Sequence, residues 1–178
     1  MNTYAIMKGI AGEAIVENLL LRNFNKNMIL KNLVIEGNQI DLVAITKAGI
    51  FCFEVKNFSG CITGCRDKKI WYVKYGKRTK TMFNPLLQNQ RHVKLLKTKI
   101  NRVPVFNIVV FTGTAKVNIE DDRLINMYKL ISFMNSKPQF FTTNIRMKEI
   151  RDTLKPYEDV SSVEQFKKFS KYSLYRGD

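Results

Sequence analysis

The sequence predicts an α/β (α+β) fold in which a central mixed β-sheet is flanked by helices. The predicted elements run in the order helix, several strands, helix, strand and further helices. Residues 105–112 are nearly all apolar, which is typical of a strand buried on both faces. Hydrophobic residues make up 45% of the 178 residues, enough for the core of one such domain.

The N-terminal part contains one helix and three extended segments. Residues 3–24 show helical spacing of apolar side chains, and Gly9 and Gly12 indicate that a backbone or a ligand approaches closely there. Residues 28–36 are extended and end in a turn at 37–38. Residues 39–46 and 50–56 are predicted to be the two strands of a hairpin.

The later elements follow in the same way. A loop at 57–67 leads to a strand at 70–75, rich in aromatic and β-branched residues, and to a basic turn at 76–81. Asn84 and Pro85 begin a helix that ends near Ile100. Further helices are expected at 122–135, 144–154 and 164–172. We therefore expect a core at residues 1–115 and a C-terminal helical extension packed on it at 116–178.

Composition excludes several classes of protein. The sequence has neither an apolar run long enough to span a membrane nor a leader with a cleavage site, so we expect no membrane association and a cytoplasmic location. Cys52, Cys61 and Cys65 are odd in number and have no framework spacing, which argues against a secreted disulfide scaffold. With His92 as the single histidine, a structural zinc site of about four ligands is not expected.

The positive charge is concentrated in one segment. The net charge is +15, and residues 66–102 contain 12 basic and 1 acidic side chains, whereas residues 1–65 contain 6 and 5. Such a concentration indicates a polyanionic partner, because it favours phosphate-rich ligands. The alternative is a generally lysine-rich, solvated surface, which explains the clustering less well.

Charged residues interrupt the two apolar strands of the predicted hairpin. Asp41 lies in the first strand, and Glu54 and Lys56, two apart in the second, point to the same face. Buried charges require a partner or a metal. Two carboxylates beside a lysine indicate a divalent-cation site suited to phosphodiester hydrolysis. The alternative is a structural ion pair between Asp41 and Lys56 at the end of the sheet.

An ordered set of motifs over residues 8–115 resembles the NERD (nuclease-related) domain of the PD-(D/E)xK nuclease superfamily. The motifs are Gly9-x-x-Gly12-Glu13, Gln39-Ile40-Asp41, Gly49-Ile50-Phe51-x-x-Glu54-Val55-Lys56-Asn57, Gly60, Trp71 and Asn84-Pro85-x-x-Gln88-Asn89. The resemblance implies a restriction-endonuclease-like fold. One departure is Ile40, which stands where the superfamily has the proline of its name.

The resemblance also implies roles for individual residues. Asp41 and Glu54, with the backbone carbonyl of Val55, would hold Mg²⁺ or Mn²⁺, and Glu13 would act through the water shell of the metal. Lys56 would orient or activate the attacking water, and Gln88 would join the site from the later helix. Alternatively, Glu13 is a surface acid in an ion pair, and Gln88 only bonds the start of its helix.

The basic segment supplies the expected contacts to nucleic acid. As a group, the candidates for phosphate contacts are Arg66, Lys68, Lys69, Lys77, Arg78 and Lys80. We expect Trp71 and Tyr72 to serve in packing rather than in base stacking, and His92 to be a polar surface or packing residue rather than a catalyst.

Three functions remain open at this point. The first is a magnesium-dependent nuclease acting on DNA, in DNA processing or repair. The second is a nucleic-acid-binding module with a nuclease-like fold and little or no activity. The third is a regulatory or scaffold domain whose C-terminal helices engage a protein partner. The sequence does not distinguish DNA from RNA, single from double strands, or exonuclease from endonuclease action.

Overall fold

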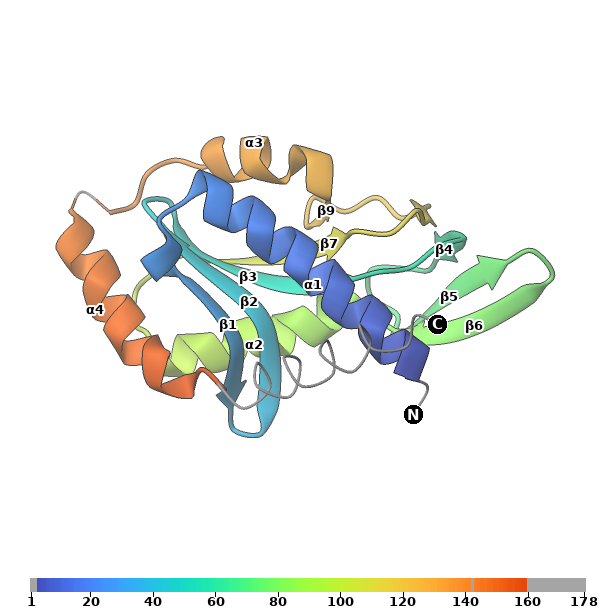
Figure 1. Ribbon diagram of the computed structural model, residues 1–178, viewed down its shortest axis with the longest axis horizontal. Helices are drawn as coiled ribbons and strands as arrows, with labels where there is room; N and C mark the ends of the chain where they lie inside the picture. The colour runs from blue at the N-terminus through green and yellow to red at the C-terminus, as the bar shows by residue number, and fades with distance from the viewer. Residues whose placement is uncertain (1–2, 142, 160–178) are drawn as a thin grey trace, which may run out of the picture.

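A computed structural model describes residues 3–141 and 143–159 and confirms the mixed sheet flanked by helices (Figure 1). The central sheet has the strand order β1-β2-β3-β7-β9. Its first three strands are antiparallel neighbours, and β7 and β9 continue the sheet in parallel with β3. The bounds are β1 Ile29–Ile35, β2 Asn38–Thr46, β3 Gly49–Lys56, β7 Val105–Phe111 and β9 Leu124–Asn126.

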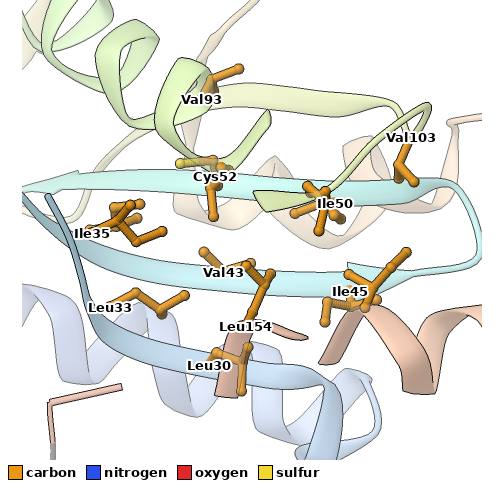
Figure 2. Close-up of a cluster of buried hydrophobic side chains, with 14 of the residues drawn as sticks. Leu30, Leu33, Ile35, Val43, Ile45, Ile50, Cys52, Val93, Val103 and Leu154 are labelled. Carbon is orange, nitrogen blue, oxygen red and sulfur yellow. The ribbon is translucent and has the colours of Figure 1, made fainter. Parts of the chain in front are cut away.

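Helices cover both faces of this sheet. The helix α1 (Thr3–Asn23) and the short α3 (Leu130–Asn135) share one buried cluster with the phenylalanines of β3. The helices α2 (Pro85–Lys99) and α4 (Asn144–Leu154) pack on the opposite face. Figure 2 shows this second cluster, in which Val93 of α2 and Leu154 of α4 meet side chains of the strands such as Val43.

Alternation along β3 determines which residues face which helices. Phe51 and Phe53 lie in the α1 cluster, whereas Ile50 and Cys52 lie in the α2 cluster. Continuing the alternation places Glu54 on the α2 face. The strand is buried over nearly its whole length, because helices cover both of its faces.

A second, smaller sheet carries the basic segment. Its strand order is β6-β5-β4-β8, from β4 Cys61–Thr63, β5 Ile70–Tyr75, β6 Arg78–Phe83 and β8 Lys116–Val117. Trp71 and Val73 of β5 are buried against Leu86 of α2 and Val109 of β7 in a third cluster. This cluster attaches the smaller sheet to the central one.

The basic turn expected at 76–81 is wrong beyond its first residues. Only Gly76 and Lys77 form the turn, and the chain returns as β6, which pairs with β5 along its whole length. Gly76 has a φ of 56°, the left-handed conformation that a two-residue hairpin turn requires. The first four residues of β6 are Arg, Thr, Lys and Thr, so the segment lacked the apolar alternation that predicts a strand.

The helix expected at 122–135 is also wrong in its first half. Leu124–Asn126 form β9, Met127–Lys129 form a 3₁₀ turn, and α3 starts only at Leu130. Asp121 accepts hydrogen bonds from the backbone and the side chain of Arg123, which directs the chain into β9. Residues after 115 thus add strands to both sheets as well as helices.

The loop expected at 57–67 is wrong in its middle, because Cys61–Thr63 form β4. The remaining described elements agree with the sequence. The helices expected at 3–24, 84–100 and 144–154 are α1, α2 and α4, and a 3₁₀ turn at Lys155–Tyr157 follows α4. The helix expected at 164–172 lies outside the described residues, and the domain boundary at residue 115 stays a prediction. Among residues 3–141 and 143–159, no helix has the length and apolar character needed to cross a bilayer.

Candidate active site

The predicted acidic residues meet where β2 and β3 part. The antiparallel pairing of these strands ends at Leu42 and Phe53, so Asp41 is the first residue beyond the ladder. The backbone N–H of Val55 donates instead to Oδ2 of Asp41, at 2.9 Å. The carboxylate therefore satisfies a backbone group that the neighbouring strand no longer pairs, and this bond holds Asp41 beside β3.

Glu54 is the most deeply buried acid of the site. Only 1% of the residue is exposed, and its Oε1 lies 2.5 Å from Nζ of Lys56. Its Oε2 is buried and finds no hydrogen-bond partner among the described residues. The ion pair of Lys56 is thus with Glu54, whereas the structural alternative had placed it on Asp41. One carboxylate oxygen of Glu54 stays available to a further ligand.

The helix α2 brings Gln88 to the same place. Asn84 caps the helix, accepting a hydrogen bond from the backbone of Leu86 at 2.9 Å. One turn later, Oε1 of Gln88 accepts a hydrogen bond from Nζ of Lys56 at 3.3 Å. The ammonium group is therefore held between Glu54 and Gln88, which fixes its position relative to the two strands.

The helix α1 packs closely against Thr112 and Asn57, and this packing brings Glu13 to the site. A Cβ on Gly12 would lie 2.8 Å from Oγ1 of Thr112 and 2.9 Å from Cβ of Asn57, so only glycine fits. Asn57 in turn donates to the backbone carbonyl of Lys8 at 2.8 Å. The close contact expected at Gly12 is therefore confirmed. At Gly9 no backbone approaches, because no atom of the described residues lies within 4 Å of a Cβ there, and a close ligand at Gly9 stays a prediction.

All three acids have raised pKa values, and burial is the largest cause in each case. Burial, and then the charge of Asp41, raise the pKa of Glu54 to about 7, against the attraction of Lys56. The same two causes raise the pKa of Glu13 to about 7. Burial also raises the pKa of Asp41, although the Val55 N–H and Lys56 oppose it. A single lysine thus leaves the three acids without full compensation, which is the electrostatic condition that a bound cation relieves.

His92 is a site residue whose place the sequence did not reveal. It is buried on α2, and its Nδ1 lies 3.5 Å from Oε2 of Glu54. Burial and the positive charges of Lys56 and Arg91 lower its pKa to about 4, so the ring is neutral at pH 7. Of the two roles expected for His92, its burial rules out a polar surface residue and agrees with a packing residue. The four-residue spacing from Gln88 was the available signal, since it puts both side chains on one side of α2.

The donor set suits a hard divalent cation, although the side chains do not enclose one. Carboxylate oxygens are the ligands that Mg²⁺ prefers, and the buried Oε2 of Glu54 accepts no hydrogen bond from the described residues. Within residues 3–141 and 143–159, no three His, Cys, Asp or Glu side chains are grouped closely enough to hold a metal ion. A cation would therefore complete its shell with water and backbone oxygen, as magnesium usually does.

The basic candidates all lie on the surface of the smaller sheet. The side chains of the loop before β5 and of the β5–β6 hairpin are exposed, namely Arg66, Lys68, Lys69, Lys77, Arg78 and Lys80. The packing role expected of Trp71 is confirmed, since it is fully buried. The same expectation for Tyr72 is wrong, because that residue is half exposed.

Comparisons with known proteins agree with this geometry. The family model described as nuclease-related domain (NERD) matches residues 8–112, which includes every predicted site residue from Glu13 to Gln88. An uncharacterized protein of Bacillus anthracis is 29% identical over 111 residues, covering 58% of this chain and 52% of that protein. The chain thus spans about half the length of this curated relative. No solved structure matches significantly. The chain belongs to the NERD, or nuclease-related domain, family.

Proposed function

We propose that this protein is a metal-dependent nuclease that hydrolyses phosphodiester bonds of DNA, in DNA processing or repair. One observation carries the proposal. Burial and the charge of Asp41 raise the pKa values of Glu54 and Glu13 at the end of the central sheet, while Lys56 is held between Glu54 and Gln88. Structural ion pairs normally balance charge, whereas this arrangement leaves a buried acid without full compensation.

Each site residue would have a separate role. Asp41, Glu54 and the carbonyl of Val55 would bind Mg²⁺ or Mn²⁺, and Glu13 would act through its water shell. When bound, the ion would polarise the scissile phosphate and lower the pKa of a coordinated water. Lys56 would orient the attacking water and stabilise charge that develops on the phosphate oxygens. Gln88 would hold the ammonium group in place through its 3.3 Å hydrogen bond.

The surface charge supports a polyanionic substrate. The exposed lysines and arginines of residues 66–80 follow directly on the strand that carries Glu54 and Lys56. Contacts of this kind position the phosphate backbone without reading its sequence. They are equally compatible with DNA and RNA, so the choice of DNA rests on the family resemblance.

Cleavage assays with metal and site variants test the proposal. Plasmid and labelled single-stranded DNA are incubated with Mg²⁺, Mn²⁺ or chelator, using wild type, Asp41→Asn and Glu54→Gln. The proposal expects metal-dependent cutting by wild type that falls at least about a hundredfold in both variants. Asp152→Asn, at an exposed position on α4, is the control and should cut like wild type. Cutting that survives both site substitutions would refute the assignment.

A binding module without useful activity is the second candidate. The observation that favours it is the ion pair between Lys56 and Glu54, 2.5 Å long, which partly neutralises the acid without a metal. This reading expects DNA to bind in the presence of chelator, with a steep dependence on salt and no response to Asp41→Asn. Intact DNA under all metal conditions, together with such binding, would favour it over the nuclease.

A further inference from the structure

The β5–β6 hairpin presents an apolar face to solvent. Ile70, Tyr72 and Phe83 are 43%, 50% and 42% exposed. Ile70 pairs directly with Phe83 across the two strands, and the next residue of β5 on this face is Lys74. We call these four residues the outer face of the hairpin. Figure 1 shows that the hairpin extends away from the central sheet.

The opposite face of the hairpin holds it rigidly. Trp71 is fully buried, and its indole N–H donates to the carbonyl of Cys65 at 2.9 Å. A Cβ on Gly64 would lie 2.4 Å from the indole ring, so the loop packs directly on it. The outer face is therefore a preformed platform whose exposure does not depend on loop motion.

Basic side chains lie on and beside this platform. A hollow of about 500 Å³ beside it is lined by Gly64, Cys65, Lys68, Lys69, Ile70 and Tyr72. Residues 66–83 contain seven lysines and arginines and a single acid, Asp67. Exposed aromatic rings framed by cations fit a polyanion that also offers flat apolar surfaces. An apolar protein partner would not need so much positive charge.

We infer that the outer face of the hairpin binds single-stranded nucleic acid, with bases stacked on Tyr72 and Phe83 and phosphates on Lys68, Lys69 and Lys74. Stacking on a side chain requires an unpaired base, since the faces of bases inside a duplex are already covered. A duplex would use the lysines alone. The aromatic residues therefore specify the single strand.

The platform is linked to the candidate active site through the start of α2. The amide of Asn84 donates to the carbonyls of Arg66 and Lys68, at 2.8 and 2.9 Å. Gln88, which contacts Lys56, lies one helical turn beyond, or about 6 Å along the helix axis. That this strand is also the substrate rests on the proposed nuclease function, whereas binding to the platform does not.

Binding of a labelled thymidine oligonucleotide, followed by fluorescence anisotropy with chelator present, tests the inference. The full chain is compared with Tyr72→Ala, Tyr72→Phe and, as a matched control, Tyr128→Ala. Tyr128 is 85% exposed but lies in the 3₁₀ turn before α3, away from the hairpin. We expect Tyr72→Ala to weaken binding about tenfold, while Tyr72→Phe and Tyr128→Ala stay within about twofold.

A duplex of the same length distinguishes stacking from charge. Tyr72→Ala should change duplex binding by less than about twofold, whereas Lys68→Ala combined with Lys69→Ala should weaken both ligands. Fluorescence of Trp71, the single tryptophan, shows whether each variant is folded. Phe83→Ala, on the same face, should repeat the selective loss.

Three results would overturn the inference. The first is single-strand binding that Tyr72→Ala leaves intact, and the second is an equal loss for strand and duplex. The third is a wild-type dimer that Tyr72→Ala dissociates, which would make a second copy the occupant. Because cleavage plays no part here, selective binding by a chain that never cuts DNA would refute the nuclease proposal and leave this inference standing.

Discussion

Replacing Glu54 by glutamine is expected to stabilise the metal-free protein at pH 8. Glu54 is 1% exposed, and burial and Asp41 raise its pKa from 4.5 to about 7. Below pH 4.5 the acid is protonated in the folded and unfolded states alike. Between 4.5 and 7 the unfolded chain loses the proton that the folded chain keeps, so the free energy of unfolding falls as pH rises.

The magnitude follows from these two pKa values. Between pH 5 and pH 8 the contribution of Glu54 falls by about 2.5 kcal/mol. Glutamine has a similar shape and can still accept a hydrogen bond from Lys56, but it does not titrate. The Glu54→Gln variant should therefore match wild type within about 1 kcal/mol at pH 5 and exceed it by about 2–3 kcal/mol at pH 8.

Urea unfolding followed by Trp71 fluorescence measures this difference. Both proteins are unfolded at pH 5, 6, 7 and 8 in the presence of chelator. Glu149→Gln removes an exposed acid paired with Arg146 on α4 and should shift stability by less than about 0.5 kcal/mol at every pH. If wild type and Glu54→Gln keep a constant difference from pH 5 to pH 8, the description of a buried, uncompensated acid is wrong.

Four further substitutions test the site and its framework. Gly113→Ala should destabilise by about 2 kcal/mol or more, because the Cβ would lie 1.9 Å from the carbonyl oxygen of Phe58. A Cβ at Gly9 would have no atom of the described residues within 4 Å, so Gly9→Ala should stabilise α1 by about 0.5–1 kcal/mol. Equal changes in stability for Gly113→Ala and Gly9→Ala would contradict the packing. Asn89→Ala should cost about 2–4 kcal/mol, because its buried amide donates to Cys52, Asn107 and Ile108; a loss in urea unfolding below about 1 kcal/mol would refute this. Lys56→Met should lower cleavage at least tenfold while Mn²⁺ still binds, and loss of both would assign Lys56 to metal binding.

The sequence predicted the parts of the site that depend on local pattern. Alternation along two apolar segments with a glycine turn between them placed Glu54 and Lys56 on one face of a strand next to Asp41. Asn84 and Pro85 marked the start of α2 because capping is a local interaction. These residues therefore came together as expected.

Features that depend on tertiary packing were not predictable in this way. His92 is buried because α2 packs across β3. Its spacing from Gln88 placed both side chains on one side of α2, but did not show which side the sheet would cover. The first four residues of β6 are polar, and the strand forms because β5 offers an edge. Tyr72 is exposed because Trp71 and Val73 occupy the buried face of β5, and the sequence does not say which face of a strand is covered. The burial of His92, the formation of β6 and the exposure of Tyr72 all depend on which surfaces pack together in the folded protein. Residue type alone does not determine that packing.

Calorimetric titration of Mn²⁺ into the metal-free full chain at pH 7 measures whether the acidic site binds a divalent cation. Because Glu13 and Glu54 have pKa values of about 7, a cation that binds them must displace protons. The account predicts one ion bound per chain, a heat that varies with the ionisation enthalpy of the buffer, and loss of binding in Asp41→Asn. Absence of binding, or equal binding by wild type and Asp41→Asn, would contradict it.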